Sequence, residues 1–170
     1  MLHAGNGGMC YIDSVELDEV YTPLRVHTRR LIEDSEGAGR FRGAPGIRVE
    51  LGPVNCRMEA GFVADGNIHI PLGARNGGPA SRSDQFRLTV KGELQRLDQC
   101  SQVWIEDGEV LVSIACGGGG YGDPKSRDPE RVLQDVREGI VSRNRAEEVY
   151  GIVIDDNMEI DKTATQSLRA

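Results

Sequence analysis

Gly117-Gly-Gly-Gly-Tyr-Gly-Asp-Pro124 separates two parts of the chain that have different sequence patterns. Short alternating segments and tight turns precede it, and short amphipathic helical segments follow it. Glycine loses the most backbone entropy on folding, so four in a row favour neither a helix nor a strand interior. The stretch therefore predicts a structural corner. A phosphate-binding loop is the less favoured alternative, because no Lys-Ser/Thr pair follows the glycines and no GxGxxG motif opens a helix.

The chain has 170 residues, which suits one domain, and its 22 glycines and 5% aromatic residues indicate a turn-rich fold with an aliphatic core. A net charge of −7 argues against nucleic acid or an anionic membrane as the main partner. No apolar run approaches the roughly 20 residues of a membrane span, and the N-terminus lacks a secretory pattern. Four cysteines without a CxxC motif favour a cytosolic protein with reduced thiols; they are Cys10, Cys56, Cys100 and Cys116.

Charge is distributed unevenly near the N-terminus. Residues 1–22 contain four acidic residues and no Lys or Arg, whereas residues 23–48 contain six Arg and three acidic residues. Two such patches suit docking to a partner with complementary charge, but on charge alone two solvated faces are the favoured interpretation.

The part of the chain before the glycines predicts β-strands. Apolar residues alternate with polar ones, as in half-buried strands, within residues 24–33, 47–51, 56–62, 86–90 and 103–105. Residues 109–115 are apolar and β-branched, which also favours a strand. Asp65-Gly66 and Asp107-Gly108 each predict a hairpin, because Asp and Gly tolerate positive φ. Turn-forming residues dominate residues 34–46 and 71–84, which are expected to be long loops.

The part after the glycines predicts short helices. Asp128, Ser142 and Asp161 are each suited to cap a helix, and Gly139 and Gly151 are suited to end one. The apolar stripes of these helices are narrow, so they need a surface to lie on, either the β-part or another chain. We therefore expect an α+β fold of one domain overall. Residues 1–116 form a β-rich region of barrel- or sandwich-like antiparallel sheets, and residues 117–170 form the glycine corner and a helical tail.

No catalytic, cofactor-binding or metal-binding residue can be nominated from the motifs. The histidines His3, His27 and His69 are scattered, and no HExxH, CxxC, GxSxG or Walker motif occurs. Some residues suit contact with a partner instead. Trp104 lies on the polar face of its strand, either under the helical tail or at an interface. The predicted partner contacts are Trp104, Arg40, Arg42, Val132, Val136 and Tyr150.

Arg40 and Arg42 flank Phe41 within a glycine-rich loop. Two arginines in such a loop suit bidentate binding of a carboxylate or a phosphate. We favour a second interpretation, in which they pair with the acidic residues 1–22 or with a partner.

Several blocks of the sequence, taken together and in order, resemble the C-terminal part of the hydantoinase B/5-oxoprolinase family. They are Tyr21-Thr-Pro-Leu-Arg-Val26, Asp34-Ser-Glu-Gly-Ala-Gly-Arg-Phe-Arg-Gly-Ala-Pro-Gly46, Gly117-Gly-Gly-Gly-Tyr-Gly-Asp-Pro124, Arg127-Asp-Pro-Glu-Arg-Val-Leu-Gln-Asp-Val-Arg-Glu-Gly-Ile-Val-Ser142 and Val149-Tyr-Gly-Ile-Val153. In that family the region usually ends a subunit several times longer. The chain is therefore expected to be either a piece of such a subunit or a separately encoded small subunit.

A split arrangement of this kind occurs among ATP-dependent ketone carboxylases, and the nearest match is the small gamma subunit of acetophenone carboxylase. The resemblance implies a structural subunit of a complex that carboxylates acetophenone to benzoylacetate with ATP and without biotin. The resemblance implies that larger hydantoinase A-like subunits bind ATP and Mg, and that hydantoinase B-like subunits belong to the same complex. It also implies that the isolated chain is inactive. A split part of an ATP-dependent hydantoinase or 5-oxoprolinase, which hydrolyses cyclic amides, is the first alternative. A free-standing binding module is the second.

Overall fold

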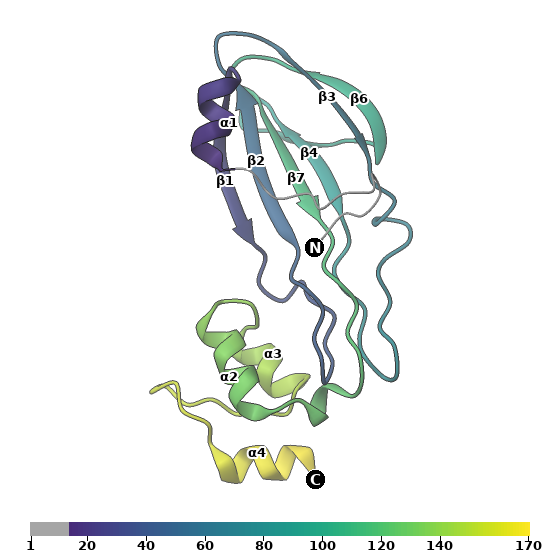
Figure 1. Cartoon of the computed structure of the whole chain (residues 1–170), viewed down its shortest axis with the longest axis vertical. Coiled ribbons are helices and arrows are strands. Elements are labelled where there is room, and N and C mark those ends of the chain that lie inside the picture. The colour runs from purple at the N-terminus through teal and green to yellow at the C-terminus, as the bar shows by residue number, and fades with distance from the viewer. Residues whose placement is uncertain (1–13) are drawn as a thin grey trace. The chain divides into compact units, whose positions relative to one another are not determined.

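The computed structural model describes residues 14–170; the expectations for residues 1–13, with His3 and Cys10, lie outside the described residues. Figure 1 shows the chain, whose elements are α1 (Val15–Tyr21), β1 (Leu24–Leu31), β2 (Ile47–Pro53), β3 (Met58–Val63), β4 (Asp84–Leu88), β5 (Leu94–Arg96), β6 (Cys100–Ile105), β7 (Val110–Ala115), η1 (Pro124–Ser126), α2 (Pro129–Arg137), α3 (Arg143–Glu148) and α4 (Lys162–Arg169). The described strands form a five-stranded sheet, in the order β1-β2-β7-β4-β5, and a two-stranded sheet of β3 and β6. The predicted α+β fold with a helical C-terminal tail is confirmed.

Two compact units make up the structure, and each draws on three stretches of the chain. Unit 1 contains the described residues up to Arg29, together with Val49–Val63 and Gln85–Ser113. Unit 2 contains Arg30–Arg48, Ala64–Asp84 and Ile114–Ala170. Neither unit is a continuous segment of sequence.

Strands β3 and β6 of unit 1 are antiparallel and lie side by side in Figure 1. Met58 is opposite Ile105, and Val63 is opposite Cys100. Successive side chains of a strand point to opposite faces, so one face of this pair is directed inward. Ile105 on that inward face has no exposed surface.

Helix α1 was not expected from the sequence, because its apolar and acidic residues have no clear period. The Ser14 hydroxyl caps it by accepting a hydrogen bond from the N–H of Leu17. Asp18 of α1 forms an ion pair with Arg29 of β1 at 2.8 Å. This pair lies within unit 1, so the acidic residues near the N-terminus meet arginines of the adjacent strand.

Both Asp-Gly pairs occur in turns, but the hairpin predictions are wrong, because neither turn joins two paired strands. After Asp65-Gly66 the chain forms a turn in which Ile68 donates to the Asp65 carbonyl, and no strand follows at residues 67–70. Asp107-Gly108 connects β6 to β7, yet β6 pairs with β3 whereas β7 lies between β2 and β4. A tight turn fixes the local chain direction, while burial of apolar faces decides which strands pair.

Three glycine-rich segments of unit 2, around Gly37, Gly78 and Gly118, lie against one another and are joined by backbone hydrogen bonds. The N–H of Gly37 donates to the carbonyl of Gly118, the N–H of Gly78 to that of Ala38, and the N–H of Gly120 to that of Gly78. A Cβ on Gly120 would overlap the carbonyl group of Ala38, so the close approach of the backbones requires glycine here. These N–H groups are engaged within the chain, as a structural corner requires.

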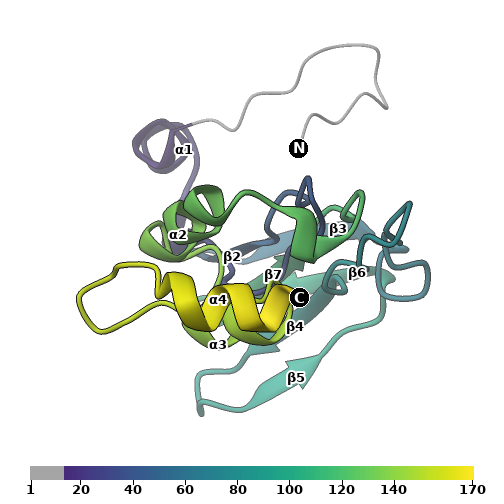
Figure 2. The same cartoon turned by 90° about the horizontal axis from the view of Figure 1, so that it is seen from below.

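The helices of unit 2 begin where the sequence predicts. Asp128, Ser142 and Asp161 cap α2, α3 and α4, and each side chain accepts a hydrogen bond from a backbone N–H of the first turn. Figure 2 shows these three helices gathered together. Val132 of α2 and Ala146 of α3 belong to one core cluster, whose other members lie outside these helices and are Ala38, Ile140, Val141, Tyr150 and Ile152. The apolar stripes of α2 and α3 therefore pack within the chain itself.

Candidate functional site

The buried carboxylate of Asp135 in α2 joins the helix to the loop of residues 34–46. It accepts hydrogen bonds from Arg42 Nε at 2.8 Å and from an Nη of Arg127 at 2.8 Å. Arg127 also donates to the backbone carbonyl of Arg40. The expectation that Arg42 pairs with residues 1–22 or with a partner is therefore corrected. Arg42 binds a carboxylate of its own chain, because Asp135 lies on the same helical face as Val132 and is buried beside the loop.

A second buried carboxylate, that of Glu36, joins the same loop to α3 and to Tyr150, two residues beyond the end of that helix. Glu36 Oε1 accepts hydrogen bonds from the Tyr150 hydroxyl and from Arg145 Nε, each at 2.9 Å. Arg145 also donates to the Glu36 carbonyl oxygen at 3.0 Å. The Glu36 side chain has no exposed surface. Because a buried charge is costly unless it is paired, these contacts are what permits an acid at this position.

The pKa values of the partners reflect this environment. Burial raises the pKa of the Tyr150 hydroxyl well above its ordinary value, and the negative charge of Glu36 and the hydrogen bond to it raise it further. Burial lowers the pKa of Arg145, but the hydrogen bond and the charge of Glu36 outweigh burial and leave the pKa raised. Both partners are thus held protonated, as donors to the carboxylate.

The other predicted contact residues of the helices are part of the core. Val132 and Tyr150 have no exposed surface, and Val136 is half-buried against the same cluster. The prediction that Val132 and Tyr150 contact a partner is corrected, because their side chains are already covered by unit 2. The narrow apolar stripes of these helices were expected to require a covering surface, and other residues of unit 2 provide that surface.

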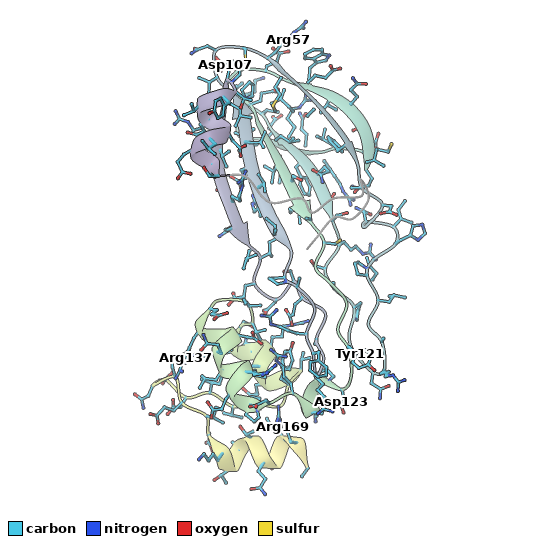
Figure 3. All side chains as sticks on the ribbon, in the orientation of Figure 1. Arg57, Asp107, Tyr121, Asp123, Arg137 and Arg169 are labelled. Carbon is cyan, nitrogen blue, oxygen red and sulfur yellow. The ribbon has the colours of Figure 1, made fainter. Side chains whose placement is uncertain are left out.

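Arg40 belongs to an exposed group with two aromatic rings, which we call the aromatic patch (Arg40, Phe41 and Tyr121). The Arg40 guanidinium carbon lies 5.6 Å from the centroid of the Phe41 ring, and the Phe41 and Tyr121 ring centroids are 6.3 Å apart. Phe41 and Tyr121 are each about half exposed, at 53% and 47%, and Figure 3 marks the position of Tyr121. A hollow of about 370 Å³ adjoins the patch, lined by Arg40, Phe41, Ser126, Asp128 and Arg131.

Trp104 lies in β6 of unit 1 and is 45% exposed. The guanidinium carbon of Arg57, which Figure 3 marks, lies 4.3 Å from the ring centroid, in a cation–π contact. The ring therefore keeps open surface. That this surface contacts a partner stays a prediction.

Sequence reasoning missed the two buried carboxylates. Asp135 carried a signal, because it shares the apolar stripe of α2 with Val132 and Val136, where an acid must be paired. Glu36 gave a weaker signal of burial, because an acidic residue in a glycine-rich loop is usually solvated. Phe41 and Tyr121 were noted only as members of motifs.

Within residues 14–170, no three His, Cys, Asp or Glu side chains are grouped so as to hold a metal ion. None of the helices in the same residues is long and apolar enough to cross a membrane.

The chain was compared with known protein families and proteins. The family described as Hydantoinase B/oxoprolinase matches residues 1–124. The chain belongs to this family. Within the hydantoinase B/oxoprolinase family, it is 38% identical to caprolactamase subunit beta of Pseudomonas jessenii over 92% of its own length. It is 39% identical to the acetophenone carboxylase delta subunit of Aromatoleum aromaticum over 87% of its length.

The fold agrees with these similarities. The crystal structure of ATP-dependent caprolactamase from Pseudomonas jessenii superimposes with a TM-score of 0.77 and 32% identity over 92% of the chain. The chain spans only 28% of the length of caprolactamase subunit beta and 26% of the acetophenone carboxylase delta subunit. It therefore corresponds to one region of these longer family members.

Proposed function

We propose that the chain is a structural part of an ATP-dependent, multi-subunit enzyme, in which it supports a larger hydantoinase B-like portion. The observation that carries the proposal is the similarity along 92% of the chain to caprolactamase subunit beta, at 38% identity. The geometry supports a structural role, because both buried carboxylates hold the loop of residues 34–46 onto the helices. ATP, with Mg, would be used by hydantoinase A-like partner subunits in the cytoplasm, and the isolated chain would be inactive.

The first candidate reaction is the ATP-dependent carboxylation of a ketone, acetophenone with bicarbonate giving benzoylacetate, without biotin. It is supported by the 39% identity to the acetophenone carboxylase delta subunit. That relative is a delta subunit, so this identity supports a place in such a complex and not an assignment as a gamma subunit.

The second candidate reaction is the ATP-dependent hydrolysis of a cyclic amide. It is favoured by the fold match and the 38% identity to the caprolactamase. A ketone and a lactam both present a carbonyl group, and identities of 39% and 38% do not rank them.

One assay on the purified assembly tests the proposal and separates the reactions. The chain is tagged in its source, the co-purifying subunits are identified by mass spectrometry, and ATP hydrolysis is measured with acetophenone, caprolactam, hydantoin and 5-oxoproline. ATP hydrolysis that requires both a ketone and bicarbonate supports the carboxylase. Hydrolysis with a cyclic amide and no need for bicarbonate supports the amidase. A monomeric chain with no such subunits contradicts the proposal and favours a free-standing binding module.

A further inference from the structure

The two-stranded sheet of unit 1 has one face that residues 14–170 leave exposed. Directly opposite residues of β3 and β6 lie on the same face, and three such pairs alternate with the inward pairs. We call these residues the outer face: Glu59 with Trp104, Gly61 with Gln102, and Val63 with Cys100. All six are exposed, whereas Ile105 on the inward face is fully buried. An isolated two-stranded sheet is at best marginally stable, so further packing suits it.

The outer face carries apolar groups around a hollow. Val63 is 84% exposed and Trp104 is 45% exposed. A shallow hollow of about 450 Å³ lies on the same two strands, lined by Gly61, Phe62, Val63, Cys100, Ser101 and Gln102. A Cβ built on Gly61 meets no atom within 4 Å, so the missing side chain leaves open space there. The hollow can thus receive one side chain of a partner.

The charged groups at this face are engaged with its own residues. The amide of Gln102 donates a hydrogen bond to the Glu59 carboxylate. The Arg57 guanidinium lies over the Trp104 ring. The surface that remains is therefore mostly uncharged. A tryptophan with a stacked arginine beside an apolar hollow has the composition of the centre of a protein interface.

We propose that the outer face of β3 and β6 is a docking surface for the rest of a hydantoinase B-like subunit. That partner would present a neutral surface and would insert one apolar side chain into the hollow over Gly61. The length of the relatives identifies this occupant, because the chain matches only 28% of caprolactamase subunit beta. The outer face also lies inside residues 1–124, the part that the family match covers. This inference rests on the proposed function, since it requires that larger portion as the partner.

Cys100 provides a reporter that requires no substitution. Its thiol is free and exposed on the outer face of the chain. The assembly is recovered through a tag on the chain, and mass spectrometry identifies the partner by hydantoinase B-like sequence. N-ethylmaleimide is then applied to the free chain and to the assembly, and the rate of Cys100 alkylation is followed by peptide mapping. We expect alkylation at least tenfold slower in the assembly. Equal rates would overturn the inference.

Substitution of Gly61 tests the hollow directly. A Cβ at position 61 meets no atom within 4 Å, so Gly61→Arg should keep the melting temperature of the chain within a few degrees of wild type, while partner recovery falls at least tenfold. Leu94→Arg is the matched control, because Leu94 is also an exposed apolar strand residue of unit 1, at 54%, but outside the outer face. It should recover the partner in full.

The outcomes separate the two proposals. An assembly that contains a hydantoinase B-like partner but leaves Cys100 reactive, or forms equally well with Gly61→Arg, contradicts the docking surface and leaves the proposed function standing. Failure to recover any such partner overturns both. A homodimer of the chain that protects Cys100 without a larger partner also overturns the inference, because the occupant is then a second copy.

Discussion

Replacement of Tyr150 by Phe is the sharpest test of the buried Glu36 contacts. The change removes one hydroxyl and keeps a ring that has no exposed surface. That hydroxyl donates to Glu36 Oε1 at 2.9 Å, and within the described residues no hydrogen bond reaches Glu36 Oε2. The carboxylate of the variant therefore keeps only the donors of Arg145.

The magnitude follows from the charge of the acceptor. A hydrogen bond to a charged group contributes about 1.5–3 kcal/mol to stability, so we expect a loss of about 2 kcal/mol. For a chain of this length, that loss lowers the melting temperature by about 4–8 °C. Tyr121→Phe makes the same chemical change at a half-exposed ring in the same unit, and should alter stability by less than about 0.5 kcal/mol.

Thermal and urea unfolding followed by circular dichroism at 222 nm suit this comparison, because α2, α3 and α4 all belong to unit 2. Trp104 fluorescence reports on unit 1 and should change little. The reasoning is refuted if Tyr150→Phe and Tyr121→Phe unfold at the same midpoint, since the buried hydrogen bond then contributes nothing.

Three further predictions concern the same structure. The raised pKa of Tyr150 favours its protonated form in the folded state. The free energy of unfolding of the wild type should therefore fall as the pH rises above about 10, by up to about 1.4 kcal/mol per pH unit. The difference between the unfolding midpoints at pH 9 and pH 11 should be smaller for Tyr150→Phe than for the wild type. Asp135→Asn leaves the buried Arg127 without its paired charge and should cost about 3 kcal/mol in urea unfolding, whereas the fully exposed Asp156→Asn should leave the midpoint unchanged. Trp104→Ala should reduce recovery of the assembly more than it lowers the melting temperature; intact assembly with a large loss of stability would show that the ring is a core residue.

The local features of the fold were predictable from sequence because they depend on neighbouring residues. Asp128 followed by Pro129 determines where α2 begins, through one hydrogen bond and one fixed φ angle. Alternation predicted β2, and a run of apolar and β-branched residues predicted β7, for the same reason. The partners of the strands were not predictable, since the Asp107-Gly108 turn looks the same whether or not β6 and β7 pair.

The candidate site was less predictable, because its contacts join residues far apart in the sequence. Glu36 meets Arg145 and Tyr150 across separations of 109 and 114 residues. No local pattern relates an acid in a loop to a tyrosine after a distant helix. Exposure was equally hidden, so Tyr150 and Trp104 looked alike as contact residues, although one is buried and the other open.

The contacts among the glycine-rich segments have a consequence for synthesis on the ribosome. The N–H of Gly37 donates to the carbonyl of Gly118, which is synthesised 81 residues later (118 − 37). At about 5–20 residues per second, this delay is about 4–16 s. Unit 1 needs no residue beyond Ser113, whereas unit 2 needs residues up to the last helix. During translation the first unit can therefore fold while the loop of residues 34–46 is still without its partners.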